Sequence, residues 1–234
     1  MSEGAETAMP DARSDKAVAA AAAVAEVRNG MLVGLGTGST ATEAIRALGE
    51  RVANGLDVRA VATSRASDML ARQLGIAMLE FADVPRIDLT IDGADEIDPR
   101  LFAVKGAGGA MLREKVVAAA SDRMVVIADG SKRVAAIGAA RVPVEILPFA
   151  RASVMTVLGD GATLRMQDGA PYLTDNGNWI ADCAFDLDDP VETAVWLDGI
   201  PGVLGHGLFL REVDGAYIAD AGVVSRLERA GSSR

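Results

Sequence analysis

The chain has 234 residues, half of them hydrophobic, which is enough to bury the core of one or two domains. Lys and Arg total 23 against 33 Asp and Glu, and the net charge of −10 argues against the basic field that nucleic acid or an anionic membrane surface attracts. A single cysteine and a single histidine exclude an intrachain disulfide and a zinc site of His and Cys ligands. We therefore expect a cytoplasmic protein that binds neither nucleic acid nor membrane and contains no metal.

The first fourteen residues combine Ser, Gly, Pro and Ala with acidic residues and lack the basic segment that opens a signal peptide. We expect residues 1–14 to form a disordered tail. Ala17 to Val27 is apolar but shorter than the roughly 20 residues that span a membrane. It is therefore predicted to be a packed helix.

From residue 16, helical stretches alternate with short β-branched runs. The predicted elements are, in chain order, helix 16–27, strand 31–35, helix 40–52, strand 58–63, helix 67–74, strand 87–91, helix 109–120 and strand 124–128. Strands separated by helices of this length pair in parallel through right-handed crossovers. The predicted fold class is α/β, an open and mostly parallel sheet with helices on both faces in a Rossmann-like, three-layer arrangement.

After Pro143 the predicted order changes to βαββαβ, which is typical of a small ferredoxin-like α+β domain. Its elements are strand 144–147, helix 151–158, two strands flanking Asn176-Gly177, helix 191–197 and strand 203–210. The Asn-Gly pair favours a type I′ hairpin turn because both residues tolerate positive φ. We assign residues 141–213 to this smaller domain, and residues 15–140 and 214–234, with a strand at 217–220 and a closing helix at 223–229, to the catalytic α/β domain.

The segment Gly34 to Thr40, GLGTGST, joins a predicted strand to a predicted helix, so its amides and the helix N-terminus point toward one ligand. It lacks the lysine of a P-loop, and Ser39 replaces the third glycine of a dinucleotide fingerprint. A small phosphate ester fits this segment better than NAD or ATP, and no cofactor is expected. The alternative is a tight turn with Ser/Thr capping.

Asp92 and Asp95 follow the predicted strand at 87–91, at the carboxyl edge of the sheet where open α/β proteins bind ligands. Their spacing does not match a calcium loop. Two nearby acids can raise the pKa of one of them, which suits a proton donor. The alternative is a solvated acidic loop, and we assign Glu96 and Asp98 to such a loop.

Lys105 follows a further apolar run and precedes the turn Gly106 to Gly109, where missing side chains let a ligand approach the backbone. Glu114 lies near the start of the next predicted helix between two basic residues. It is either a surface glutamate in ion pairs or a carboxylate desolvated against a cleft, and the latter would transfer protons. Lys132 is either a second cation for phosphate or an ordinary exposed lysine.

Taken together, these segments resemble ribose-5-phosphate isomerase, type A. The motifs follow one another in the family's order and cover most of the chain from residue 16 to about 210. They are GLGTGSTA at 34–41, DGADEID at 92–98, KGAGGAMLREK at 105–115, ADGSK at 128–132, PVEILPFA at 143–150 and TDNGN at 174–178.

The resemblance implies an isomerase without cofactor or metal that interconverts D-ribose 5-phosphate and D-ribulose 5-phosphate through a cis-enediol(ate), in the non-oxidative branch of the pentose phosphate pathway. Glu114 would be the base that moves a proton between C2 and C1, and Asp92 would help to open the furanose ring. Asp95 and Lys105 would hold hydroxyls and stabilise the oxyanion.

The resemblance also implies a set of substrate-binding residues, which are Thr37, Gly38, Ser39, Thr40, Asp92, Gly93, Ala94, Asp95, Lys105, Gly106, Ala107, Gly108 and Lys132. Such enzymes are usually homodimers or homotetramers, with the smaller domain in assembly. We therefore expect a homodimer or a homotetramer whose partner is a small sugar phosphate.

Two other classes of protein are alternatives to an isomerase. A sugar-phosphate sensor of a transcription regulator would need a DNA-binding segment, and the residues before Met31 offer only one alanine-rich helix and a tail. An acyl-transferring relative would use a glutamate as nucleophile toward coenzyme A esters. The continuous LREK segment at 112–115 and the short chain speak against it.

Overall fold

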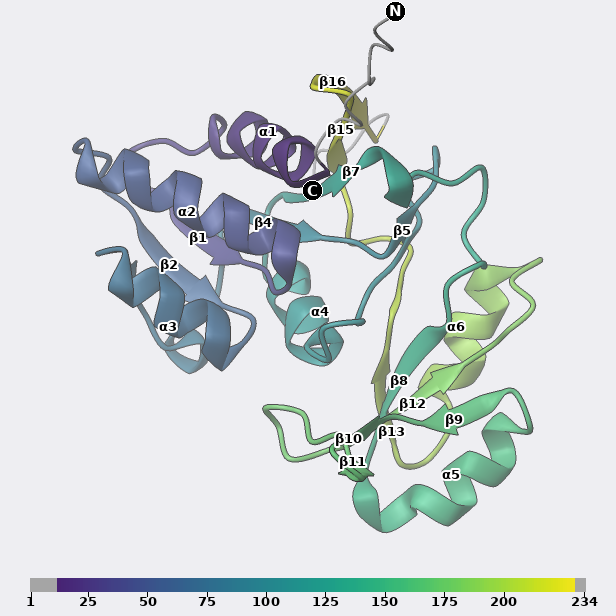
Figure 1. Ribbon diagram of the computed structural model, residues 1–234. Helices are drawn as coiled ribbons and strands as arrows, with labels where there is room; N and C mark the ends of the chain where they lie inside the picture. Colours follow the sequence, from purple (N-terminus) through teal and green to yellow (C-terminus); the bar gives the residue numbers. More distant parts are fainter. Residues whose placement is uncertain (1–11, 230–234) are drawn as a thin grey trace, which may run out of the picture.

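The computed structural model describes residues 12–229 of the chain (Figure 1). Most of the predicted tail, residues 1–11, lies outside the described residues. Helix α1 (Ala12–Val24) begins inside the predicted tail and ends before Val27. The alanine-rich helix therefore starts and ends about one turn earlier than the predicted helix at 16–27.

A seven-stranded sheet forms the larger part of the molecule, with the strand order β16-β15-β7-β4-β1-β2-β3. All neighbours in it are parallel except the outermost pair, β15 and β16. The strands are β1 (Leu32–Leu35), β2 (Arg59–Ala62), β3 (Ala77–Met78), β4 (Leu89–Gly93), β7 (Met124–Asp129), β15 (Gly215–Asp220) and β16 (Val223–Glu228). The predicted α/β class with a mostly parallel sheet is confirmed.

Helices cover both faces of this sheet. On one face α1, α2 (Ser39–Ala53) and α3 (Arg65–Gln73) bury residues such as Ala20 and Ile45 against β1, β4 and β7. On the other face, α4 (Met111–Ala119) packs Met111 and Val117 against separate clusters of buried side chains, and Figure 1 shows it between the large sheet and the smaller one. The short helix η1 (Phe81–Asp83) lies beside α4.

The chain reverses its direction of travel across the sheet next to β1. β2 and β3 extend the sheet on one side of β1, whereas β4 pairs with β1 on the other side and the chain then continues to β7. The loops that follow β1 and β4 therefore diverge at the carboxyl ends of these two strands. Open α/β sheets bind ligands at such a switch point.

The predicted closing helix at 223–229 is wrong, because these residues form strand β16, antiparallel to β15. Ala221 and Gly222 connect the two strands with φ of 48° and 78°. Positive φ at both positions of a two-residue loop matches the right-handed twist of a hairpin. The β-branched pair Val223 and Val224 then continues the sheet.

The smaller part is built on a four-stranded antiparallel sheet with the order β13-β8-β12-β9. Together with α5 and α6, this is the predicted ferredoxin-like order. Its elements are β8 (Val142–Ile146), η3 (Pro148–Ala150), α5 (Arg151–Leu158), β9 (Ala162–Leu164), β12 (Trp179–Cys183), α6 (Pro190–Asp198) and β13 (Val203–His206), and a two-stranded ribbon of β10 (Met166–Gln167) and β11 (Ala170–Pro171) extends from it.

The predicted type I′ hairpin at Asn176-Gly177 is also wrong. The two-residue hairpin loop is Asp168-Gly169, where φ is 51° and 80°, between β10 and β11. At the predicted site only Gly177 has positive φ. The Thr174 hydroxyl accepts hydrogen bonds from the amides of residues 176 and 178, and this side chain organises the turn without paired flanking strands.

A third, small sheet joins the two parts and leads into the site. It consists of β5 (Glu96–Ile97), β6 (Ala103–Val104) and β14 (Leu208–Phe209). The predicted strand at 203–210 is split into β13 and β14 at Gly207, whose amide donates to Pro143 O and whose carbonyl accepts from the amide of Lys105.

The predicted solvated acidic loop at Glu96 and Asp98 is wrong as well, since both side chains are buried. The Glu96 carboxylate accepts the amides of Gly138 and Ala140, and the Asp98 carboxylate accepts the amide and guanidinium of Arg100. Buried carboxylates need partners of this kind. Both acids therefore hold loops in place.

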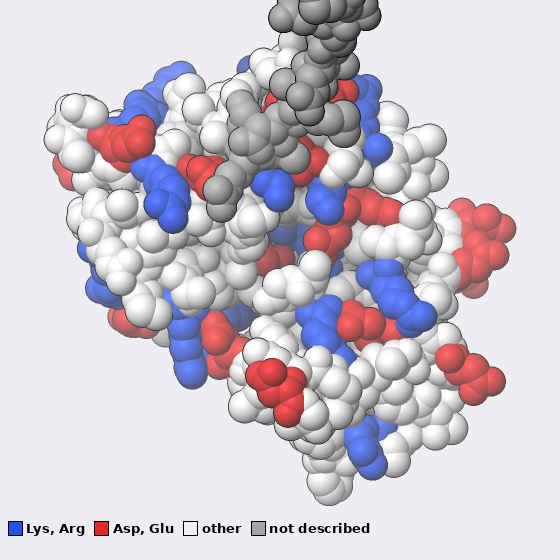
Figure 2. All heavy atoms as spheres, viewed as in Figure 1, with Lys and Arg blue, Asp and Glu red and all other residues white. Residues whose placement is uncertain are grey.

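The face in Figure 2 shows acidic and basic side chains interspersed, without one continuous basic patch. Among residues 12–229, no helix is long and apolar enough to cross a membrane.

Candidate active site

The turn that follows β1 brings bare backbone close to Asp92 at the end of β4. A Cβ built on Gly36 would lie 1.9 Å from Asp92 Oδ1, so only glycine fits there. Gly38 has φ of 103° and caps α2, which begins at Ser39, without a side-chain hydrogen bond to the first amides. The N-terminus of this fifteen-residue helix is therefore available to an anion.

Three buried charges meet where β4, β6 and α4 come together. Lys105 Nζ lies 3.0 Å from Asp92 Oδ2 and 3.2 Å from Glu114 Oε2, and it donates to the carbonyl of Gly93. The side chains of Lys105, Asp92 and Glu114 are only 2%, 0% and 4% exposed. Neither of these two carboxylate oxygens accepts a well-aligned hydrogen bond from any described residue. The cluster is held by charge and keeps acceptor capacity for a ligand.

The two neighbouring aspartates are held in different ways. Asp92 Oδ1 accepts the amides of Thr37 at 3.0 Å and Gly93 at 2.7 Å, which fixes the carboxylate below the turn after β1. Asp95 Oδ2 accepts the amide of Ala107 at 2.9 Å and so connects the acidic segment to the glycine turn after Lys105. Asp92 is fully buried, whereas Asp95 is half-buried and lines the cavity.

Burial raises the pKa of Glu114 to about 8, and the negative charge of Asp92 adds to this effect while Lys105 opposes it. Burial also raises the pKa of Asp92 above its ordinary value, against the pull of Lys105. Burial alone would lower the pKa of Lys105, but the two carboxylates outweigh it and raise that pKa, so the ammonium stays charged. A carboxylate with a pKa near neutrality beside a permanent cation is well suited to move protons.

The LREK segment places three consecutive charged side chains in three directions. Arg113 Nε donates to Asn176 Oδ1 at 2.7 Å, while Lys115 Nζ donates to the carbonyl of Leu208 at 2.7 Å. Glu114 faces Lys105 between them. The interpretation of Glu114 as a surface glutamate is therefore excluded.

The predicted substrate-binding residues surround one cavity of about 300 Å³, except that Asp92 lies beneath its wall. The lining comprises Lys16, Thr37, Gly38, Ser39, Thr40, Gly93, Ala94, Asp95, Lys105, Gly106, Ala107, Gly108, Glu114 and Lys132. Lys132 ends η2 (Gly130–Lys132) directly after β7.

Sequence reasoning missed Lys16 of α1. Its Nζ donates to Ser39 Oγ at 3.1 Å and lies 4.0 Å from Asp129 Oδ2, at the mouth of the cavity. The available signal was weak, since Lys16 is one lysine at the start of an alanine-rich helix and only the packing of α1 on α2 brings it to the site.

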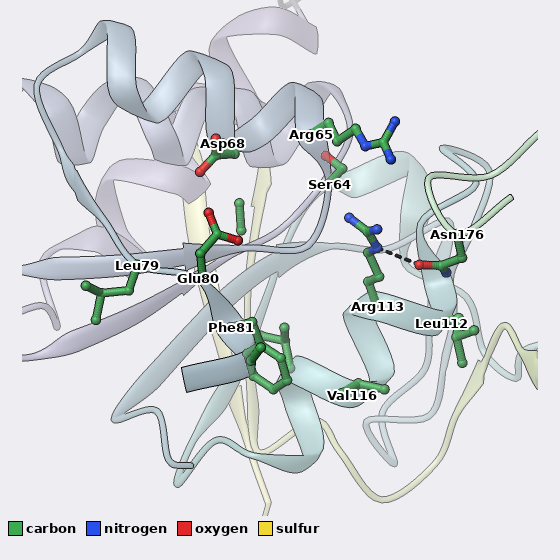
Figure 3. Close-up of a pocket in the computed structure, with 13 residues that line it drawn as sticks. Ser64, Arg65, Asp68, Leu79, Glu80, Phe81, Leu112, Arg113, Val116 and Asn176 are labelled. Atoms are coloured by element: carbon green, nitrogen blue, oxygen red, sulfur yellow. Dashed lines mark hydrogen bonds between the residues drawn. The ribbon is translucent and has the colours of Figure 1, made fainter. Parts of the chain in front are cut away.

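A larger cavity of about 660 Å³ lies on the other side of α4 (Figure 3). Arg65 and Arg113 lie at one end of it and Phe81 and Val116 at the other, and the hydrogen bond from Arg113 to Asn176 closes one side. None of the predicted site residues lines it.

In residues 12–229 no group of three or more His, Cys, Asp and Glu side chains has the arrangement of a metal site.

The fold and this site define a Rossmann-like α/β protein with a buried cluster of one lysine and two carboxylates at the switch point of its sheet. Comparison with known proteins makes this specific. The chain belongs to the family described as Ribose 5-phosphate isomerase A (phosphoriboisomerase A), whose model matches residues 59–222.

Relatives that match the chain over nearly their full length carry the name of the same family. The chain is 51% identical to the Ribose-5-phosphate isomerase A of Sphingopyxis alaskensis, over 90% of this chain and 94% of that protein. It is 46% identical to the protein of the same name from Rhodopseudomonas palustris strain HaA2, over 92% and 97% of the two chains.

Solved structures share the whole fold. The ribose 5-phosphate isomerase A of Methanocaldococcus jannaschii superimposes with a TM-score of 0.87 at 37% identity, covering 91% of this chain and 97% of that one. A D-ribose-5-phosphate isomerase in complex with phospho-erythronic acid gives a TM-score of 0.90 at 35% identity, covering 94% and 100%.

Proposed function

We propose that this protein interconverts D-ribose 5-phosphate and D-ribulose 5-phosphate in the non-oxidative branch of the pentose phosphate pathway. One observation carries the proposal, namely Lys105 Nζ held 3.0 Å and 3.2 Å from the buried carboxylates of Asp92 and Glu114 in a cavity beside a free helix N-terminus. An aldose-ketose shift needs a base, a charge that stabilises an oxyanion, and an anchor that holds the substrate. The cavity supplies all three.

The phosphate end of the substrate would lie at the start of α2. The amides and hydroxyls of residues 37–40 and the ammonium groups of Lys16 and Lys132 line that end of the cavity. Helix N-termini and ammonium groups are common phosphate ligands. Phospho-erythronic acid, bound by a structurally similar isomerase, carries a phosphate and a carboxylate, the two kinds of anionic group that this cavity could hold.

Glu114 would act on the open-chain sugar. Its carboxylate takes the proton from C2, the electrons of that bond form a C1–C2 double bond, and the carbonyl electrons move to O1. The resulting oxyanion faces the ammonium of Lys105, which remains charged because of its two carboxylate neighbours. After a proton has passed from O2 to O1, Glu114 returns its proton to C1 and the C2 carbonyl forms.

The two aspartates would assist this exchange. Asp92, whose pKa is raised by burial, would donate a proton during opening of the furanose ring. Asp95, with one oxygen held by the amide of Ala107, would position a sugar hydroxyl with the other. No residue in this account requires a cofactor or a metal ion.

The direct test is conversion of ribose 5-phosphate to ribulose 5-phosphate by the purified full-length chain in the presence of a metal chelator. We expect turnover that arabinose 5-phosphate inhibits competitively. Loss of turnover that a divalent ion restores would contradict the metal-free mechanism, and absence of conversion with and without metal would contradict the proposed activity.

We further propose that the protein acts in the cytoplasm as a homodimer or a homotetramer assembled through its smaller domain. Large apolar side chains are exposed there, with Phe149 95% and Val195 66% exposed. Light scattering should therefore give a mass of two or four chains of 24.1 kDa. Phe149→Ser should shift that mass toward one chain, and a monomeric wild-type protein would contradict the proposal.

A further inference from the structure

The glycine turn after Lys105 is held from outside the large domain. Arg165, between β9 and β10 of the smaller domain, donates from Nη1 to the carbonyls of Gly106 at 3.0 Å and Ala107 at 3.1 Å. Tyr172 Oη donates to the next carbonyl, that of Gly108, at 3.3 Å. Three successive carbonyls of the cavity wall thus accept hydrogen bonds from one neighbouring segment.

The Arg165 side chain is itself fixed. Its Nε donates to Asp182 Oδ2 at 2.8 Å, and its Nη2 donates to the other oxygen of that carboxylate, which lies on β12. Its guanidinium carbon lies 5.7 Å from the centre of the Tyr172 ring. A bidentate pair with an aromatic neighbour leaves a guanidinium little freedom. The side chain is 16% exposed, so solvent screens this arrangement only partly.

The turn has one hydrogen bond of its own, from the amide of Gly109 to the carbonyl of Gly106 at 3.0 Å, and its other carbonyls are held from outside. Gly106 and Gly109 adopt φ of 113° and 75°, and glycine loses more conformational freedom than other residues when it is fixed. A planar trans peptide points its N–H away from its C=O. By binding the carbonyl of Gly106, Arg165 therefore turns the amide of Ala107 the other way, toward Asp95 Oδ2 at 2.9 Å.

We propose that Arg165 is a positioning residue for the reaction. Anchored by Asp182, it holds the turn 106–109 in the conformation that forms the cavity wall. The positions of Asp95 and Lys105 relative to each other depend on this conformation. The smaller domain thereby contributes to turnover without touching the substrate. This inference rests on the proposed isomerase function.

The test compares Arg165→Ala with Arg141→Ala in the full-length protein. Arg141 is a matched control, because it also donates to backbone carbonyls of the smaller domain, those of Gly161 and Asp182 at 3.1 Å, but none of its hydrogen bonds reaches the turn. A misplacement of about 1 Å costs on the order of a hundredfold. We expect Arg165→Ala to lose about tenfold to a hundredfold in kcat/KM, and Arg141→Ala to stay near the wild type.

Two further readouts separate positioning from general loss of structure. Added guanidinium should restore part of the turnover of Arg165→Ala and none in Arg141→Ala. Hydrogen exchange of peptides covering residues 105–110 should become faster in Arg165→Ala only. Equal turnover and equal exchange in the two variants would overturn the proposal.

If Arg165→Ala does not fold, Asp182→Asn tests the same role, because it removes one of the two carboxylate oxygens that anchor the Arg165 guanidinium. Loss of one hydrogen bond predicts about fivefold lower kcat/KM and faster exchange of the turn, and unchanged exchange would overturn the proposal. Exchange is measured without substrate. Faster exchange in a protein that shows no isomerase activity would therefore contradict the proposed function and leave the positioning role intact.

Discussion

Helix α4 separates two cavities that differ in how far their charged side chains are buried and in what those side chains contact. On one side, in about 300 Å³, Glu114 contacts Lys105 with a side chain only 4% exposed. On the other side, in about 660 Å³, Arg113 is 35% exposed and its hydrogen bonds go to the loop at residues 175–176. Buried charges in contact change each other's pKa, whereas exposed ones are screened. The smaller cavity is therefore the one equipped for chemistry.

Apart from loss of the base Glu114, the largest effect should come from removing the cation of the smaller cavity. In Lys105→Met, two buried carboxylates lose their common partner, which should lower the free energy of unfolding by about 3–5 kcal/mol. Loss of oxyanion stabilisation should lower kcat by about a hundredfold to a thousandfold. Denaturant unfolding and steady-state kinetics measure the two effects. Lys132→Met is the control, since this lysine lines the same cavity outside the buried cluster. Equal losses of stability and of kcat in both variants would contradict a special role of the buried cluster.

A smaller effect should follow at the phosphate end. Lys16→Ala removes the ammonium that donates to Ser39 Oγ at 3.1 Å. We expect KM for ribose 5-phosphate to rise about tenfold, with kcat changed little, because a charge-assisted hydrogen bond contributes about 1.5 kcal/mol or more. Arg46→Ala removes an exposed charge from α2 outside the cavity and serves as control. An unchanged KM in Lys16→Ala would restrict phosphate binding to the α2 terminus and Lys132.

The smallest effect should come from the larger cavity. Val116 lies on α4 two residues after Glu114, is 47% exposed and lines that cavity. Val116→Ser should leave kcat/KM within about twofold of the wild type, as surface substitutions usually do. A tenfold loss measured in the same assay would show that the larger cavity contributes to turnover.

Much of the site could be predicted from the sequence because its residues follow strands or begin helices. Asp92 is the penultimate residue of β4, Lys105 directly follows β6 and Glu114 lies in the first turn of α4, and each position is visible in local patterns. What local patterns cannot supply is contact between distant segments. Lys16 and Arg165 reach the site only through packing of α1 and of the smaller domain.

The errors in the fold have similar causes. The residues of β16 were expected to be helical, but Ala221 and Gly222 adopt the positive φ of a hairpin loop and β15 offers a free edge. Asn176-Gly177 has the composition of a hairpin turn, yet the fully buried Glu145 accepts hydrogen bonds from the side chains of Thr174 and Asn176 and shapes the loop instead. Pairing with β15 overrides the expected helix at β16, and contacts with Glu145 override the turn preference of Asn176-Gly177.

The raised pKa of Glu114 also predicts how stability depends on pH. The folded state holds the proton of Glu114 up to about pH 8, whereas a free glutamate releases it near 4.5. The stability that this protonation contributes is present below pH 4.5 and is lost as the pH rises through 8. Melting curves should therefore show the wild type losing stability relative to Glu114→Gln across this interval. A difference that does not change with pH would contradict the raised pKa.

The central claim is that Glu114 is the base that transfers the proton, and the most direct measurement is the pH profile of kcat/KM for the wild type beside that of Glu114→Gln. The base must be ionised, so wild-type kcat/KM should rise with pH through about 8. Glu114→Gln should bind phospho-erythronic acid but turn over about a hundredfold to ten-thousandfold more slowly, with no rise near pH 8. A Gln variant that retains near-normal turnover and the wild-type pH profile would contradict the account.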